Sequence, residues 1–91
     1  MGLGAMLERL LRGAPPPTIA TRLSATDAIA IAREAAVEYP LHDNLNVATA
    51  TRAVDGAVIW RVETGGVGSF LYVLIDDATG IVRETHSYDG R

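Results

Sequence analysis

The stretch VLIDDATGIVRE, Val73–Glu84, joins two apolar runs through residues that favour a turn. Asp76 and Asp77 come just before Ala-Thr-Gly, which predicts a tight hairpin loop with Gly80 in the left-handed conformation. Carboxylates that act as a general acid and base need a pocket that shifts one pKa, whereas carboxylates at a loop tip stay solvated. We therefore interpret both aspartates as solvated turn residues of a β-hairpin.

Upstream of this hairpin, apolar and polar residues alternate, which is typical of β-strands. Asp55-Gly56 predicts a two-residue type I′ turn, since both residue types tolerate positive φ. The segment TGGVGS, Thr64–Ser69, lies between two strands and contains no lysine, so it predicts a hairpin connection and not a phosphate-binding loop. Four strands are expected, at about Leu45–Val54, Ala57–Thr64, Phe70–Asp76 and Ile81–Ser87.

Before the strands, SATDAIAIAREAAVEYP has the period of an amphipathic helix. Ser24 is a good N-cap and Asp27 completes a capping box, so the helix is expected to begin at Ala25. Pro40 is expected to end it. The expected apolar face consists of Ala28, Ala32, Ala35 and Tyr39, flanked by Ile29, Ile31 and Ala36. Because alanines let a helix lie close on a sheet, the sequence predicts an α+β, cystatin-like fold, with one main helix packed on a four-stranded antiparallel sheet.

The chain of 91 residues is expected to form a single α+β domain, residues 18–91, after an N-terminal arm, residues 1–17. The arm has apolar residues at helical spacing and ends in a proline-rich segment that stops a helix. Its apolar stripe consists of Leu3, Met6, Leu7, Leu10 and Leu11. A helix this short is marginal alone in water, so its stripe needs a surface to pack on.

The composition argues against several classes of function. The formal net charge is −3 and the chain has no lysine, so nucleic acid is not an expected partner. No apolar run approaches the ~20 residues of a membrane span, and the N-terminus lacks the pattern of a secretory signal. There is no cysteine, hence no disulfide and no thiolate nucleophile. We expect a cytoplasmic protein without a membrane span.

The spacing of acidic and histidine residues matches no catalytic or metal site. His42 and His86 are far apart, and neither belongs to a His-x-x-x-His or Glu-x-x-His pattern. The hypothesis of an enzyme depends on groups near the last hairpin: Asp76, Asp77, Glu84 and His86. Those groups would need to cluster in a pocket. We therefore expect no catalytic residue, no metal and no cofactor.

The order of one helix and four strands resembles a PepSY domain over about Ser24–Glu84. The resembling pieces are SATDAIAIAREAA for that family's helix, WRV for its aromatic-x-aliphatic strand and YVLIDDATGIV for its closing hairpin. The matching residues are Ser24, Ala28, Ile29, Ile31, Ala32, Trp60, Val62, Asp76, Thr79 and Gly80. The resemblance implies a cystatin-like module that binds or restrains another protein, often a peptidase, and is not itself catalytic.

The chain is also similar to small bacterial immunity proteins of the nuclear-transport-factor-like kind. The similar parts are Ala28–Ala32, Trp60-Arg61-Val62 followed by Gly65–Gly68, and a hairpin with Ile75, Asp76, Gly80 and Val82. A chain without a leader fits this second resemblance. It implies a cytoplasmic protein that binds and neutralises a toxin domain.

Strand alternation divides the central strands between two faces of the sheet. The face toward the helix is expected to hold Val58, Trp60, Val62, Leu71, Val73 and Ile75, with Trp60 as a core residue. The other face is expected to hold the candidate partner-binding residues Ile59, Arg61, Phe70, Tyr72 and Leu74, together with Glu63. Contiguous exposed apolar patches are uncommon on monomers, so we expect the N-terminal helix, a second copy or another protein to cover it. The sequence thus predicts a non-enzymatic protein-binding module.

Overall fold

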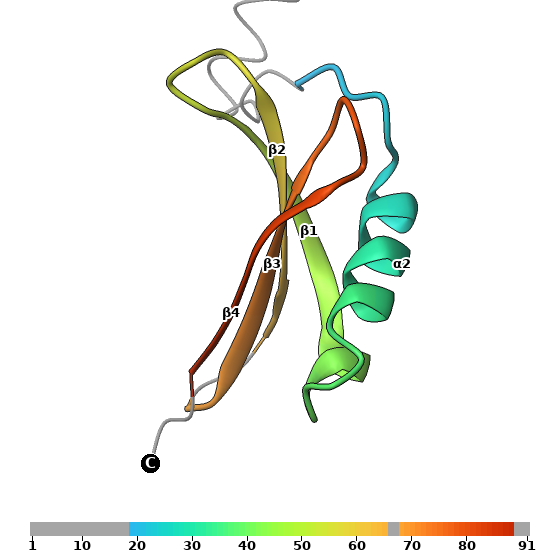
Figure 1. The fold of residues 1–91 in the computed structure, drawn as a ribbon, viewed down its shortest axis with the longest axis vertical. Coiled ribbons are helices and arrows are strands. Elements are labelled where there is room, and N and C mark those ends of the chain that lie inside the picture. The colour runs from blue at the N-terminus through green and yellow to red at the C-terminus, as the bar shows by residue number, and fades with distance from the viewer. Residues whose placement is uncertain (1–18, 66–67, 89–91) are drawn as a thin grey trace, which may run out of the picture.

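A computed structural model describes residues 19–65 and 68–88 and has one helix lying along one face of an antiparallel sheet (Figure 1). The elements are α2 (Ala25–Ala35), the 3-10 turn η1 (His42–Asn44), β1 (Leu45–Arg52), β2 (Val58–Thr64), β3 (Phe70–Asp76) and β4 (Val82–Tyr88). The four strands lie in chain order, β1-β2-β3-β4. This confirms the predicted α+β architecture. The helix predicted within residues 1–17 lies outside the described residues. Among residues 19–65 and 68–88, no helix is long and apolar enough to cross a membrane.

The capping box predicted at the start of α2 is present. The Asp27 backbone N–H donates to Oγ of Ser24 at 3.0 Å, and the Ser24 backbone N–H donates to Oδ2 of Asp27 at 3.1 Å. The Ser24 backbone N–H is the main cause of the lowered pKa of Asp27, and the Ser24 hydroxyl acts in the same direction. The buried stripe of the helix runs through Ala28, Ala32 and Ala36. The prediction that Ala35 belongs to this stripe is wrong, because an i, i+4, i+8 repeat from Ala28 to Ala36 leaves Ala35 exposed. The predicted helix end at Pro40 is also wrong: α2 ends at Ala35, and the Tyr39 N–H then donates to the Ala36 carbonyl in a tighter turn.

Small helical side chains meet larger side chains of the sheet in the core. Trp60 is 7% exposed, and Leu71, Val73 and Ile75 are completely buried. The remaining buried members are Ala28, Ala32, Ala36, Leu45 and Val62. The fully buried side chains that α2 and its C-cap contribute are all alanines, and the larger Ile29 and Ile31 pack at the edges of the core. Trp60 is confirmed as a core residue.

The hairpin between β1 and β2 differs from the predicted two-residue type I′ turn. The Gly56 N–H donates to the Ala53 carbonyl at 2.9 Å, and the Ala53 N–H donates to the Ala57 carbonyl at 2.7 Å. Gly56 has φ of 90°, whereas no described residue other than glycine has positive φ. A type I′ turn needs positive φ at both central residues, so that prediction is wrong. The loop is a three-residue type, with one left-handed glycine after a turn.

A β-bulge sets the register of β4 against β3. Ile75 lies opposite Val82, but Leu74 lies opposite Glu84, so Arg83 is an extra residue on β4. Such an insertion reverses which side chains of a strand point to which face. Beyond the bulge, His86 lies opposite Tyr72.

Candidate functional site

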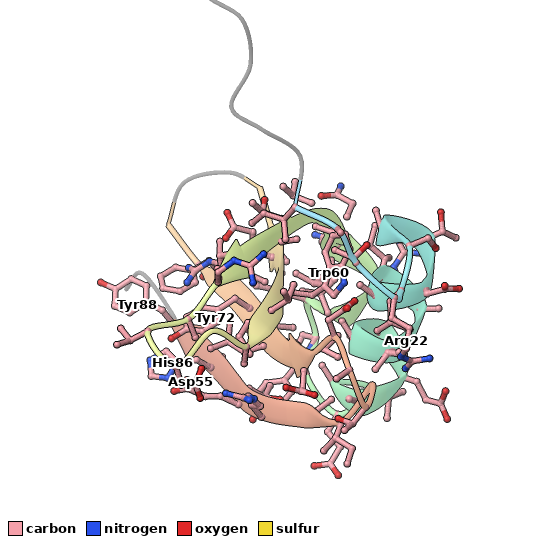
Figure 2. The ribbon with its side chains drawn as sticks, turned by 90° about the horizontal axis from the view of Figure 1, so that it is seen from above. Arg22, Asp55, Trp60, Tyr72, His86 and Tyr88 are labelled. Carbon is pink, nitrogen blue, oxygen red and sulfur yellow. The ribbon has the colours of Figure 1, made fainter. Side chains whose placement is uncertain are left out.

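The sheet face opposite α2 is the candidate functional site, and we call it the outer face. Its side chains come from the alternate positions of the four strands that do not enter the core. From β2, β3 and β4 they are Ile59, Arg61, Glu63, Phe70, Tyr72, Leu74, Glu84, His86 and Tyr88, and from the edge strand β1 they are Val47, Thr49 and Thr51. Figure 2 shows Tyr72, His86 and Tyr88 on the side of the sheet away from the helix, and Trp60 between sheet and helix.

The structure places all five predicted partner-binding residues on this face. Arg61 lies opposite Leu74 across the β2–β3 pair, and Ile59 lies opposite the last residue of β3. Ile59 is 8% exposed, so it offers little surface to a partner. Phe70, Tyr72 and Leu74 alternate along β3 with buried core residues and are half-buried themselves. Alternation along two strands was sufficient to predict this grouping.

Four rings form a stacked cluster along β3 and β4. The ring centroids of Phe70 and Tyr88 are 5.3 Å apart, and those of Tyr72 and His86 are also 5.3 Å apart. Phe70 and Tyr72, neighbours on one strand, have centroids 6.2 Å apart. Stacked rings at these distances support one another and lose little conformational freedom when a partner binds. The outer face therefore has a large, ordered apolar centre.

Charged side chains border the rings. Arg61 forms an ion pair with Glu63, and its guanidinium carbon lies 4.1 Å from the centroid of the Tyr72 ring. At the end of β3, Nη2 of Arg83 lies 2.9 Å from Oδ1 of Asp76. Exposed ion pairs add little to stability, but they hold their side chains in place. Arginine over an aromatic ring is a common element of protein interfaces.

On the helix side of the sheet, Asp77 forms an arrangement that we call the Asp77 anchor. Its carboxylate accepts hydrogen bonds from the backbone N–H groups of Arg22 (2.7 Å) and Leu23 (2.9 Å) and from Nε1 of Trp60 (2.9 Å). Nε of Arg22 also donates to the Asp77 carbonyl oxygen at 3.1 Å. Asp77 is 6% exposed, so the prediction of a solvated carboxylate is wrong for this residue. The anchor ties the segment before α2 to the β3–β4 turn.

Hydrogen bonding keeps the two turn aspartates ionised. The Arg22 backbone N–H is the main cause of the lowered pKa of Asp77, with Leu23 and Trp60 acting in the same direction and burial opposing them. For Asp76, the Thr79 hydroxyl is the main cause of the lowered pKa. Gly80 has φ of 74°, as the turn prediction requires. Both carboxylates act as hydrogen-bond acceptors: Asp76 builds the turn, and Asp77 holds the segment before α2 against it.

The groups on which the enzyme hypothesis depends are divided between the two sides of the sheet. Asp77 lies on the helix side, whereas Glu84 and His86 lie on the outer face. Asp76 is engaged with Thr79 and Arg83. General acid–base catalysis needs its groups to converge on one substrate position. The structure does not bring these four side chains together.

A groove of about 500 Å³ lies at the end of the sheet where β3 begins. The loop after α2 forms one wall with Tyr39 and Leu41, and the strand ends form the other with Phe70 and Tyr88. Its lining contains no carboxylate, imidazole or cationic side chain. Since Phe70 and Tyr88 also belong to the outer face, the groove extends that apolar surface around the end of the sheet.

No group of three or more histidine, cysteine or acidic side chains within residues 19–65 and 68–88 could hold a metal ion. His42 is used locally: its Nδ1 lies 2.7 Å from the Tyr39 carbonyl and its Nε2 lies 3.1 Å from Oδ1 of Asp43. His86 stacks on Tyr72 on the outer face. The two histidines therefore have separate surroundings, as their separation in the sequence predicts.

Glu84, His86 and Tyr88, all on β4, were not predicted to lie on the outer face. The turn before β4 is readable from the sequence, and counting from it without a bulge would place Arg83, Thr85 and Ser87 on this face instead. The bulge at Arg83 reverses the alternation. In the sequence, only the aromatic side chain of Tyr88 and the number of residues between it and Phe70 indicated that these two residues would pair across the β3–β4 hairpin.

A scan against models of protein families and searches of curated proteins and of solved structures found no match to this chain.

Proposed function

We propose that this chain is a non-enzymatic protein-binding module and that the outer face is its contact surface. The observation that carries the proposal is the cluster of rings, with Phe70 and Tyr72 at its centre, on the face that α2 does not cover. Protein interfaces are enriched in tyrosine, phenylalanine and arginine at their centres and have polar rims. The outer face has this composition, with Arg61 and Glu63 as part of the rim.

The distribution of ionisable groups supports a role without catalysis. Hydrogen bonds lower the pKa of both Asp76 and Asp77: those of Asp76 build the turn, and those of Asp77 tie the segment before α2 and Trp60 to it. The groove at the end of the sheet is lined by aromatic, aliphatic and hydroxyl side chains. Such a lining suits the burial of an apolar side chain of a partner better than it suits proton transfer.

The resemblance to PepSY domains supports a partner that the module restrains, such as a peptidase. The helix cap at Ser24, the strand with Trp60 and the turn at Gly80, which carry that resemblance, all have defined structural roles in the fold. The absence of cysteine is compatible with a cytoplasmic location, which we include in the proposal. Self-association is the second candidate, because Arg61 and Glu84, which have opposite charges, lie on either side of Leu74 on the outer face.

The proposal is tested with the immobilised chain as bait for proteins of its host and for a differently tagged copy of itself. The test variant carries Phe70→Ser and Tyr72→Ser, and the control carries Val54→Ser at an exposed apolar position on the β1–β2 hairpin. Circular dichroism and Trp60 fluorescence establish that each variant is folded. We expect a protein bound in stoichiometric amount by the wild type and the control and lost by the double variant.

Equal binding by the double variant, or no bound protein for any bait, would overturn the proposal. If the double variant does not fold, Arg61→Ala takes its place, because Arg61 is exposed and lies above the Tyr72 ring. A loss of binding of at least fivefold is then expected, as for an interface arginine.

A further inference from the structure

We infer that the outer face binds the outer face of a second copy of this chain, about a two-fold axis that runs parallel to β3. This inference rests on the proposed function, since it names the partner for the same surface. Its basis is the arrangement of charge across the three strands β2, β3 and β4.

Two neighbouring rows of side chains cross the outer face, and each row has different charges at its two ends. In the first row, Arg61 on β2 lies opposite Leu74 on β3, which lies opposite Glu84 on β4. In the second row, Glu63 lies opposite Tyr72, which lies opposite His86. The first row thus has a cation on β2 and an anion on β4, and the second row has an anion on β2 and an imidazole on β4.

A two-fold axis above β3 and parallel to it exchanges the ends of each row. Neighbouring strands are evenly spaced at ~4.8 Å, so this rotation brings β2 of one copy over β4 of the other. Arg61 then faces Glu84 of the second copy, and Glu63 faces His86 of the second copy. Each pairing occurs twice, because a two-fold interface uses the same surface on both sides.

The same axis brings the apolar side chains of β3 together. Tyr72, Leu74 and Phe70 each lie near the axis and meet the same residues of the second copy. Sheets that pack face to face keep their strands aligned to within about 30° and lie about 10 Å apart, which leaves room for two layers of such side chains. The centre of the interface is therefore aromatic and aliphatic, with the charge pairs around it.

A two-fold axis perpendicular to the strands also sets the ends of the two rows opposite one another, since Arg61 would then face Glu63 of the second copy. It would, however, place Phe70 opposite the turn at Asp76, whose carboxylate is ion-paired with Arg83. An aromatic ring over a charged turn loses the contact between apolar surfaces that drives association. The axis parallel to β3 is the better solution.

Glu84 provides a further reason to expect a partner opposite this face. Arg61 is already paired with Glu63, and Asp76 with Arg83. Glu84, by contrast, has neither an ion pair nor a hydrogen bond from its side chain within the described part of the chain. Its carboxylate is exposed and free to accept the guanidinium of a second copy.

The test is sedimentation equilibrium of the intact chain over a wide range of concentrations. We expect the wild type to form a dimer and Glu84→Arg to raise its dissociation constant at least ~10-fold, because two like-charge contacts replace two attractive ones. Glu34→Arg makes the same charge change on an exposed position of α2 and is expected to leave the dissociation constant unchanged. Circular dichroism confirms that each variant is folded.

A charge exchange tests the axis itself. Arg61→Glu and Glu84→Arg each weaken the dimer, but the double variant restores opposite charges across the parallel axis and is expected to bind more tightly than either single variant. Across the perpendicular axis, the double variant would instead face glutamate with glutamate and bind more weakly still.

The outcomes distinguish failure of this inference from failure of the proposed function. A wild type that stays monomeric at all concentrations, yet holds another protein through Phe70 and Tyr72, overturns self-association and leaves the protein-binding proposal standing. A monomer that holds nothing overturns both. A dimer weakened equally by Glu34→Arg and Glu84→Arg, or one that the charge exchange does not restore, overturns the proposed interface.

Discussion

Nε1 of Trp60 donates a hydrogen bond of 2.9 Å to Oδ1 of Asp77, across the junction of β2 with the β3–β4 turn. The same carboxylate accepts the backbone N–H groups of Arg22 and Leu23, so three donors depend on one side chain. Buried donors that lose their acceptor destabilise a protein more than a single exposed hydrogen bond would suggest. The Asp77 anchor is therefore central to the stability of the fold.

Replacing Asp77 with Ala is expected to lower the melting temperature by about 5–10 °C, since all three donors lose their acceptor. The change also removes the hydrogen bond of the single tryptophan, so the fluorescence of Trp60 in the folded state is expected to change. Asp43→Asn, at an exposed position of η1, is the matched control and is expected to melt within about 1 °C of the wild type. An equal melting temperature for Asp77→Ala would show that the anchor contributes nothing.

The anchor also makes stability depend on pH in a defined direction. The folded-state pKa of Asp77 lies below that of an unfolded aspartate, about 3.9. Its contribution is therefore complete above the unfolded pKa and is lost as the pH falls through the folded pKa. Because asparagine does not titrate, the stability difference between the wild type and Asp77→Asn is expected to be larger at pH 7 than at pH 2.5.

Urea unfolding followed by Trp60 fluorescence at both pH values measures this difference. Asp27 and Asp76 also have lowered pKa values, but both proteins retain them, so the comparison isolates Asp77. A difference that stays constant from pH 7 to pH 2.5 would contradict the account.

The packing of α2 on the sheet predicts different results for two alanines. Ala32 is completely buried, and a leucine there has no space, so Ala32→Leu is expected to cost about 1–3 kcal/mol of unfolding free energy. Ala35 is exposed, so Ala35→Leu is expected to change it by about 0.5 kcal/mol or less. Chemical denaturation of both variants checks this, and equal losses would contradict the observed phase of the helix.

The three-residue hairpin predicts a specific cost at one glycine. Gly56 has φ of 90° and open space around it, so Gly56→Ala is expected to cost about 1–2 kcal/mol from backbone strain alone. Gly56→Asn is expected to cost less, because asparagine adopts left-handed conformations more readily. Gly65 has open space and no positive φ, so Gly65→Ala serves as the control and is expected to be nearly neutral. Thermal melting distinguishes the three variants.

The features that the sequence predicted correctly depend on neighbours in the chain. The capping box joins Ser24 to Asp27, and the last turn needs glycine at position 80. Alternation along β2 and β3 also placed Arg61 and Tyr72 on one face. In each case a short-range rule, a cap, a turn or a period of two, decides the outcome.

The features that were missed depend on contacts between distant segments or on small irregularities. Nothing near Asp77 in the sequence indicates that Arg22 and Leu23 will bury it. One extra residue at Arg83 decides whether His86 reaches the outer face. Periodicity cannot reveal either, because a register shift of one residue leaves the local pattern of the strand unchanged.

The most direct measurement of the central claim is cross-linking at the centre of the outer face. The chain has no cysteine, so Leu74→Cys and Ala30→Cys each introduce a single thiol, the first beside the proposed two-fold axis and the second on the exposed side of α2. A bismaleimide spanning about 10 Å matches the separation of two packed sheets. We predict a covalent dimer in high yield for Leu74→Cys and little for Ala30→Cys. Equal yields from the two positions, or no dimer from Leu74→Cys in a folded protein, would contradict the assignment of the outer face as the surface where two copies meet.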